Sequence, residues 1–108
     1  MMKRLDVFYG PNAPLDIALL EEWLVLNGAG LSTVDRYITR LRACCEKIGD
    51  LPFGGRSRDD LVVGLRTIVF ERRVLIAYKV YEDHVEIINL FSHGRDYEAF
   101  YDEGDEEG

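Results

Sequence analysis

Alternation of hydrophobic and other residues marks the start of the chain. Residues 3–9 place Leu5, Val7 and Tyr9 on one side and mostly charged residues on the other. A period of two is typical of a β-strand with one buried face. Residues 10–12 (Gly-Pro-Asn) favour a turn, so we expect the strand to end there.

The pattern then changes to steps of three and four residues, which predicts a helix. Pro14 fits the first turn of this helix, and the Asn27-Gly28 pair is expected to end it. The hydrophobic residues that carry the helical spacing are Leu15, Ala18, Leu19, Trp23 and Leu26.

A second helix is predicted directly after a short link. Ser32 is a suitable N-cap with Asp35 at the third helical position, and the helical spacing continues to about Ile48. Gly49 is expected to stop the helix as its left-handed C-terminal residue. The hydrophobic stripe consists of Val34, Ile38, Leu41, Cys45 and Ile48. Because residues 28–30 are so short a connection, the two helices should form an antiparallel hairpin.

The last third of the chain is rich in β-branched and aromatic residues. Residues 65–70, 74–81 and 85–91 predict three strands, with turns at Glu71-Arg72 and Glu82-Asp83. Such short turns make neighbouring strands antiparallel, which gives a three-stranded meander. The order β-α-α-β-β-β therefore predicts an α+β fold, in which the helical hairpin covers one face of an antiparallel sheet.

Length and charge refine this picture. A chain of 108 residues with 47% hydrophobic content suits one domain, which we assign to residues 1–101. Residues 102–108 form an acidic C-terminal tail with five of the 20 acidic residues, so the remainder has 13 basic and 15 acidic residues, a net charge of −2. A nearly neutral domain makes direct binding to a nucleic-acid backbone unlikely, because that affinity comes largely from neutralised phosphates.

Several other classes of protein find little support in the sequence. No hydrophobic run reaches the roughly 18 to 20 residues that a membrane span needs, and the first residues do not resemble a signal peptide, so we expect a cytoplasmic protein. Cys44 and Cys45 are adjacent, which suits neither a disulfide nor a metal site. We expect two reduced thiols, no metal and no cofactor.

Two short motifs flank the meander. Residues 52–56 read Pro-Phe-Gly-Gly-Arg and lead to Gly64-Leu65-Arg66, and the last strand ends in His93-Gly94-Arg95-Asp96. In this order the motifs resemble the RelE/ParE superfamily of toxins from type II toxin–antitoxin systems, and more closely its ParE branch. The resemblance covers roughly residues 34–101.

The resemblance implies a growth-inhibiting toxin that a cognate antitoxin neutralises in a hetero-oligomeric complex. ParE-like members are associated with inhibition of DNA gyrase by binding, without catalysis, whereas RelE-like members cut messenger RNA on the ribosome. A third alternative is a non-toxic module that only binds the antitoxin. The shared fold and motifs leave the target open between gyrase and messenger RNA.

Ribonuclease chemistry needs a proton-transfer group and cations that stabilise a phosphorane-like transition state. The candidates are His93, Arg66 and Arg73, with Arg56 or Arg58 holding phosphate. This set is incomplete, because Gly94 stands where ribonuclease relatives tend to have a tyrosine, and because the chain has only three lysines. A toxin that acts by binding is therefore the favoured interpretation.

The same basic residues have structural alternatives. Arg56 and Arg58 can pair with Asp59 and Asp60, and Arg66 can be a solvated strand residue. His93 can be a hydrogen-bonded residue at the end of a strand. Arg95 and Asp96 can cap a short final helix over residues 96–101. As binding residues, the candidates are Arg56, Arg58, Arg66, Arg73 and Arg95.

The first helix is hydrophobic on more than one side. Leu20, Trp23 and Leu24 belong to a run that covers more surface than a small two-layer domain can bury. Because large exposed hydrophobic areas mark partner sites, these three residues are predicted to bind the antitoxin. The alternative is a homodimer through the same helix.

Overall fold

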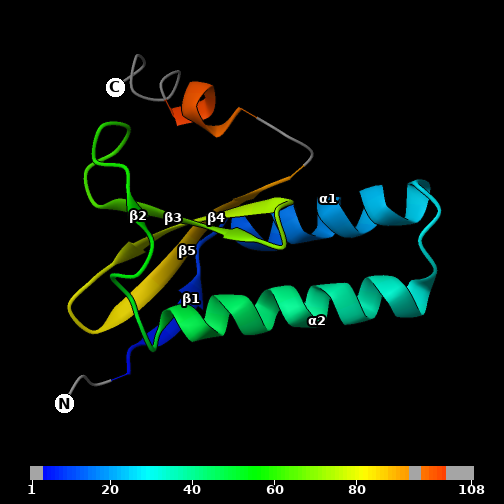
Figure 1. Cartoon of the computed structure of the whole chain (residues 1–108), viewed down its shortest axis with the longest axis horizontal. Helices are drawn as coiled ribbons and strands as arrows, with labels where there is room; N and C mark the ends of the chain where they lie inside the picture. Colours follow the sequence, from blue (N-terminus) through cyan, green and yellow to red (C-terminus); the bar gives the residue numbers. More distant parts are fainter. Residues whose placement is uncertain (1–3, 93–95, 102–108) are drawn as a thin grey trace.

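The order of helices and strands agrees with the α+β fold expected from the sequence. The computed structural model describes residues 4–92 and 96–101, so the predicted tail, residues 102–108, lies outside the described part of the chain. The elements are β1 (Asp6–Tyr9), α1 (Ala13–Leu26), α2 (Leu31–Ile48), β2 (Arg56–Ser57), β3 (Leu65–Phe70), β4 (Val74–Val80) and β5 (His84–Phe91). Figure 1 shows α1 and α2 as an antiparallel hairpin beside the sheet.

The predicted ends of α1 are confirmed. Pro14 occupies its first turn, and the Asn27 side-chain amide donates a hydrogen bond of 2.8 Å to the Trp23 carbonyl. Gly28 then takes a left-handed conformation with φ of 95°, which glycine adopts without steric cost. The chain thereby reverses within residues 27–30, as the short link predicted.

Both predicted caps of α2 are wrong. The helix begins two residues early, at Leu31, so Ser32 lies inside the first turn and the N-cap is Gly30, without a side-chain hydrogen bond. Gly49 is right-handed, with φ of −62°. Glycine is needed there for another reason, because a β-carbon would collide with the Leu5 carbonyl oxygen. The Leu5 amide donates a 2.9 Å hydrogen bond to the Gly49 carbonyl at this close approach.

The sheet has the strand order β1-β5-β4-β3-β2. The predicted meander is confirmed, since β3, β4 and β5 pair antiparallel in sequence order. However, β1 pairs parallel with β5, so the sheet is mixed. The register of Val7 opposite Val85 and Tyr9 opposite Ile87 places hydrophobic residues on the hairpin side. The two-residue β2 at the other edge was not predicted.

Two hydrophobic cores lie on opposite faces of the sheet. The larger lies between the sheet and the α1–α2 hairpin and contains fully buried Ile17, Leu41 and Tyr78. The smaller contains Leu65, Ala77, Phe91 and Tyr101. A short helix over residues 97–101, orange in Figure 1, closes this second core.

The predicted cap of this short helix is confirmed in part. The Ala99 amide donates a 3.1 Å hydrogen bond to the Asp96 carboxylate. Arg95, the other predicted capping residue, lies outside the described residues. Among residues 4–92 and 96–101, none of the helices has the length and hydrophobicity required to traverse a lipid bilayer.

The turn between β3 and β4 holds two non-glycine residues in the left-handed region. Glu71 has φ of 48° and Arg72 has φ of 61°. Such a two-residue turn matches the twist of a hairpin, but it is usually made by Asn-Gly, because side chains with a β-carbon are strained there. Arg40 of α2 holds the turn through two hydrogen bonds to the Glu71 carboxylate, of 2.9 and 3.1 Å.

We expect Arg72→Gly to raise the free energy of unfolding by about 0.5 to 1 kcal/mol. Glycine removes the strain of the left-handed conformation, and the larger conformational entropy of the unfolded glycine chain offsets part of this gain. Urea unfolding followed by circular dichroism measures the change. The matched control is Arg73→Gly at the next position. Arg73 does not have a positive φ, so this substitution should lower the free energy of unfolding instead. A gain for Arg73→Gly, or a loss for Arg72→Gly, would contradict the assignment of strain.

Candidate functional site

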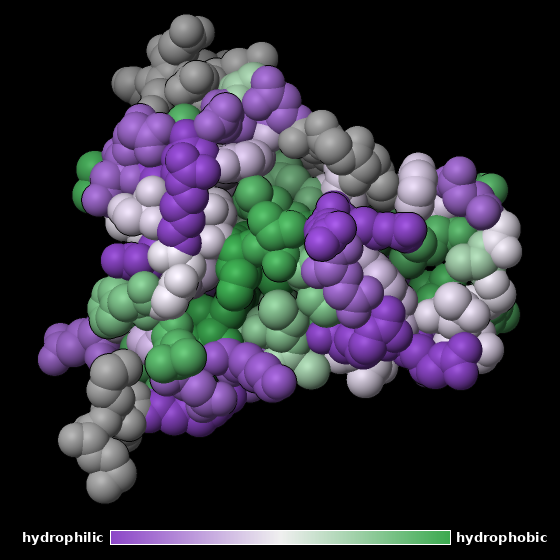
Figure 2. All heavy atoms as spheres, viewed as in Figure 1, coloured by the Kyte–Doolittle hydropathy of each residue, from purple (hydrophilic) through white to green (hydrophobic). Residues whose placement is uncertain are grey.

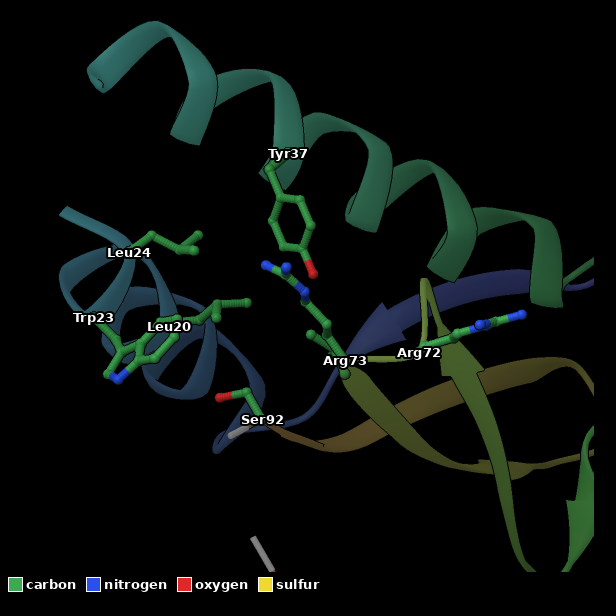
Figure 3. A pocket seen from close by; sticks show the side chains of 8 residues that line it. Leu20, Trp23, Leu24, Tyr37, Arg72, Arg73 and Ser92 are labelled. Carbon is green, nitrogen blue, oxygen red and sulfur yellow. The ribbon is translucent and has the colours of Figure 1, made fainter. Parts of the chain in front are cut away.

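A pocket of about 320 Å³ opens between the helical hairpin and the β3–β4 turn. We call it the hairpin pocket. It is lined by Leu20, Trp23 and Leu24 of α1, Tyr37 of α2, Arg72, Arg73 and Val74 at the turn, and Ser92 after β5. Figure 3 shows Tyr37, Arg73 and Ser92 facing the α1 residues across the pocket, whereas the Arg72 side chain extends away from them. Four residues predicted from the sequence as binding residues (Leu20, Trp23, Leu24 and Arg73) therefore meet at one place.

The helical spacing of α1 explains its contribution to the pocket. Leu20, Trp23 and Leu24 are three and four residues apart, so they share one side of the helix. Leu20 is only 5% exposed and belongs to the main core, whereas Trp23 is 39% exposed. Leu20 thus anchors the wall of the pocket, and Trp23 presents part of its ring at the surface.

Tyr37 contributes a buried polar atom. The residue is 9% exposed, its ring packs edge-on against Phe70 at 5.4 Å between centroids, and the Arg40 guanidinium lies 5.4 Å from the ring centre. Its hydroxyl is buried and has no hydrogen-bond partner among the residues that the structure describes. Burial, followed by the Glu71 carboxylate, raises the pKa of Tyr37 above its ordinary value, so the phenol stays protonated and can donate.

The mouth of the pocket is positively charged. Arg72 and Arg73 are exposed, and neither forms an ion pair with any residue that the structure describes. The nearest acidic residue of the turn, Glu71, is already paired with Arg40, which lowers the pKa of the Glu71 carboxyl. The pocket therefore combines a hydrophobic wall with the Arg73 guanidinium, while the Arg72 side chain starts at the mouth and points away (Figure 3).

The expected excess of hydrophobic surface on α1 is confirmed as a structural feature. Leu15, Leu19 and Leu26 are 60%, 50% and 75% exposed, and Leu31 at the start of α2 is 77% exposed. Figure 2 shows hydrophobic side chains at the tip of the hairpin and in the middle of the viewed face, bordered by hydrophilic ones. Scattered exposed leucines are ordinary in soluble domains, but several on one helix form a continuous area.

Arg66 supports the loop before β3. Its guanidinium donates hydrogen bonds to the carbonyls of Phe53 (3.1 Å) and Gly55 (2.8 Å) and lies 5.1 Å from the centre of the Phe53 ring. Tyr78 also holds this loop, because its hydroxyl donates a hydrogen bond to the Pro52 carbonyl and accepts one from the Gly55 amide, each at 2.9 Å. The Pro-x-x-Gly-Arg motif thus forms a braced loop.

Arg58 has a structural role of the kind considered as the alternative. Only 6% exposed, it donates hydrogen bonds to Asp60 (2.8 and 3.0 Å), to Glu98 (2.6 Å) and to the Tyr97 hydroxyl. These contacts raise the pKa of Arg58 and tie the short helix to the sheet. Arg56, two residues earlier, is exposed and forms no ion pair with a described residue.

The residues considered for ribonuclease chemistry are not brought together where they are described. Arg66 and Arg73 lie at opposite ends of the β3–β4 hairpin, and the strand from Arg66 to Phe70 alone spans roughly 13 Å. Arg66 is also engaged by the loop carbonyls. His93 lies outside the described residues, as does Arg95. The described arginines therefore form no common phosphate site.

Sequence reasoning missed Tyr37 and Arg72. Tyr37 lies three residues after Val34 and four before Leu41, so the helical stripe contained the signal that it faces the core. Arg72 was read only as a turn residue. Its place at the pocket mouth depends on how the turn meets α1, which local sequence does not encode.

The thiols are not part of a reactive or metal-binding site in the described chain. Cys44 and Cys45 are free, as expected from their adjacency. Burial raises the pKa of the Cys45 thiol to about 12, so it stays protonated near neutral pH. Across residues 4–92 and 96–101, no group of three or more His, Cys, Asp or Glu residues is placed to hold a metal ion.

Two solved structures share this fold. The chain is similar to one described as "Chromosomal ParDE TA system from P. aeruginosa", with 16% identity, a TM-score of 0.71, and coverage of 82% of this chain and 96% of the other. It is also similar to a conserved hypothetical protein from Helicobacter pylori solved in solution, with 24% identity, a TM-score of 0.53, and coverage of 84% and 97%. No curated protein sequence matches significantly.

The family model described as the ParE toxin of the type II toxin–antitoxin system parDE matches residues 7–97. This span includes all but the first residue of β1, both helices, the braced loop and the whole meander. The chain belongs to the ParE toxin family, as the motif resemblance predicted.

Proposed function

We propose that the chain is the toxin of a ParDE-like module, that it inhibits growth by binding DNA gyrase, and that a cognate antitoxin neutralises it. The family match over residues 7–97 carries the class of the protein. The gyrase target follows from the ParE-like motifs. Because gyrase acts on the chromosome, the proposal also places the protein in the cytoplasm.

The uncovered side of α1 and the hairpin pocket support the antitoxin as a partner. A segment with hydrophobic side chains at helical spacing would bury Leu15, Leu19 and Trp23, whose exposed fractions are between 39% and 60%. Removing such area from water stabilises a complex by about 25 cal/mol per Å². We propose that the antitoxin binds on this surface, and that free toxin exposes it.

Action by binding is supported over RNA cleavage by the positions of the arginines. Arg58 is occupied by two carboxylates and Arg66 by two backbone carbonyls. Neither cation is available to stabilise a transition state without breaking the structure around it. The part of the chain that the structure describes thus offers a partner surface and no assembled catalytic set.

Induced expression of the chain without its antitoxin is expected to stop growth and to induce the DNA-damage response within a few generations. Co-expression of the antitoxin encoded beside the gene should restore growth. Purified toxin added to gyrase and relaxed plasmid should block supercoiling or trap cleaved DNA, and mapped messenger RNA ends should not change.

Three outcomes would contradict parts of the proposal. New messenger RNA ends with intact supercoiling would assign the toxin to ribosome-dependent cleavage. Normal growth together with a tight antitoxin complex would indicate a module that only binds its antitoxin. Growth arrest with neither effect would leave the toxin class intact and reject gyrase as its target.

A further inference from the structure

The unpaired hydroxyl of Tyr37 requires an explanation. Buried polar side chains are almost always hydrogen-bonded, because an unpaired group loses its water without compensation. Tyr37 is 9% exposed, its hydroxyl has no hydrogen-bond partner in the described part of the chain, and the residue lines the hairpin pocket. Figure 3 shows the ring descending from α2 toward Arg73 with its oxygen at the lower end. The free donor therefore lies beside the guanidinium of Arg73.

The charges around this donor select the chemistry of a ligand. None of the described residues that line the hairpin pocket is Asp or Glu, and Glu71 is held by two hydrogen bonds from Arg40. Arg73 and Arg72 have no ion-pair partner within the described ranges. A phenol donor next to the Arg73 guanidinium favours an anionic acceptor, and a carboxylate can accept from both kinds of donor at once.

The hydrophobic half of the pocket limits the shape of the ligand. Leu20, Trp23 and Leu24 form one wall of a volume of about 320 Å³. A free inorganic anion would leave this wall unfilled, whereas a carboxylate at the end of a hydrocarbon stem would cover it. The strained left-handed turn of Glu71 and Arg72 leads directly to Arg73, which lies opposite this wall (Figure 3). Strain of this kind persists where the surrounding structure enforces it, often at binding sites.

We propose that the hairpin pocket binds one acidic side chain of the antitoxin, with its carboxylate between Tyr37 and Arg73 and its stem against Trp23. Tyr37 donates through its hydroxyl and Arg73 through its guanidinium. Arg73 is exposed, so it can change rotamer rapidly to admit the ligand. The identity of the partner rests on the proposed function, but the preference for a carboxylate does not.

The first experiment uses Trp23 as a reporter, because it is the single tryptophan of the chain and lines the pocket. Purified full-length protein is titrated with 4-phenylbutyrate and with the neutral 4-phenylbutyramide, and tryptophan fluorescence gives the two dissociation constants. The carboxylate should bind about tenfold more tightly than the amide, the factor expected for one charge-assisted hydrogen bond.

Variants assign that preference to the two donors. Arg73→Gln should abolish the difference between carboxylate and amide, and Tyr37→Phe should reduce it several-fold. Arg36→Gln is the matched control, because Arg36 is an exposed arginine of α2 that does not line the pocket, and the difference should be unchanged. Equal binding of both probes to the wild-type chain, or an equal preference in Arg73→Gln, would overturn the proposal.

A second experiment separates this proposal from the proposed function. In the antitoxin encoded beside the gene, each Asp and Glu of the toxin-binding segment is changed to its amide and combined with Arg73→Gln in a double-mutant cycle. One acidic position of the antitoxin should be coupled to Arg73. Changing that residue to its amide should weaken binding to the wild-type toxin and should not weaken binding to Arg73→Gln any further. A tight complex without any coupled position overturns the pocket proposal and leaves the toxin assignment standing. Absence of both complex and growth arrest, with the probe preference retained, rejects the proposed function alone.

Discussion

Replacing Tyr78 with phenylalanine is expected to lower the free energy of unfolding by about 2 to 4 kcal/mol, because two backbone groups lose their partner. The Tyr78 hydroxyl donates to the Pro52 carbonyl and accepts from the Gly55 amide, each at 2.9 Å. The side chain is fully buried, and its hydrogen bond to the Pro52 carbonyl is buried as well, so phenylalanine leaves that carbonyl without a partner. Urea unfolding should show a lower midpoint with an unchanged slope.

The control for this prediction is Tyr81→Phe, three residues further along the chain. Tyr81 is 43% exposed and stacks on His84 through its ring, which phenylalanine retains. Its loss of one hydroxyl should change stability by less than about 0.5 kcal/mol. Similar losses in the two variants would show that the loop does not depend on Tyr78.

Gly55 is a second residue on which the packing of this loop depends. A β-carbon on Gly55 would lie 2.9 Å from the Thr67 carbonyl oxygen and would collide with the Tyr78 hydroxyl. Gly55 therefore allows the loop to approach β3 and β4 closely, and the Arg66 guanidinium donates a hydrogen bond to the Gly55 carbonyl. The Pro-x-x-Gly-Arg motif, which suggested the family, therefore holds the loop at the start of the meander in place.

Periodicity was sufficient to predict both long helices and every strand except β2, but not all of the strand pairings. The turn residues around the Leu65–Phe70 strand set its ends, and the structure has the same ends. The parallel pairing of β1 with β5 depends on how the helical hairpin returns the chain, which no local pattern encodes. The two residues of β2 are too few to show any period.

Arg56 and Arg58 show why the roles of single charged residues were not predictable. They are two residues apart in similar surroundings, yet one is exposed and the other is 6% exposed. The difference comes from Glu98 and Tyr97, about forty positions away, which reach Arg58 only after the short helix has folded back. Sequence supplied the local partner Asp60 and had no access to the distant ones.

The hairpin pocket was partly predictable, because some of its residues follow a local pattern in the sequence. Leu20, Trp23 and Leu24 were found because a helix with hydrophobic residues on several sides cannot bury them all in a two-layer domain. Tyr37 became part of the pocket only when the helices were placed against the turn. Helix periodicity therefore identifies a surface, whereas the polar atoms that select its ligand require the tertiary structure.

Trp23→Ala is expected to weaken antitoxin binding about 100-fold, because partly exposed aromatic residues at the centre of an interface carry much of its affinity. Trp23 is 39% exposed and lies where the hairpin pocket meets the exposed side of α1. Isothermal titration calorimetry with the antitoxin measures the change. In cells, this variant should stop growth even when the antitoxin is present at a level that neutralises the wild-type toxin.

Phe8→Ala is the matched control for Trp23→Ala, since Phe8 is an aromatic residue of β1 that is 57% exposed and does not line the hairpin pocket. Its affinity for the antitoxin should stay within about threefold of wild type, in the range of the near-neutral majority of substitutions. Thermal unfolding of both variants must show that they remain folded. If Phe8→Ala weakens the complex and Trp23→Ala does not, the antitoxin binds the sheet edge instead. A wild-type chain that dimerises, with the dimer lost in Trp23→Ala, would assign the hydrophobic side of α1 to self-association.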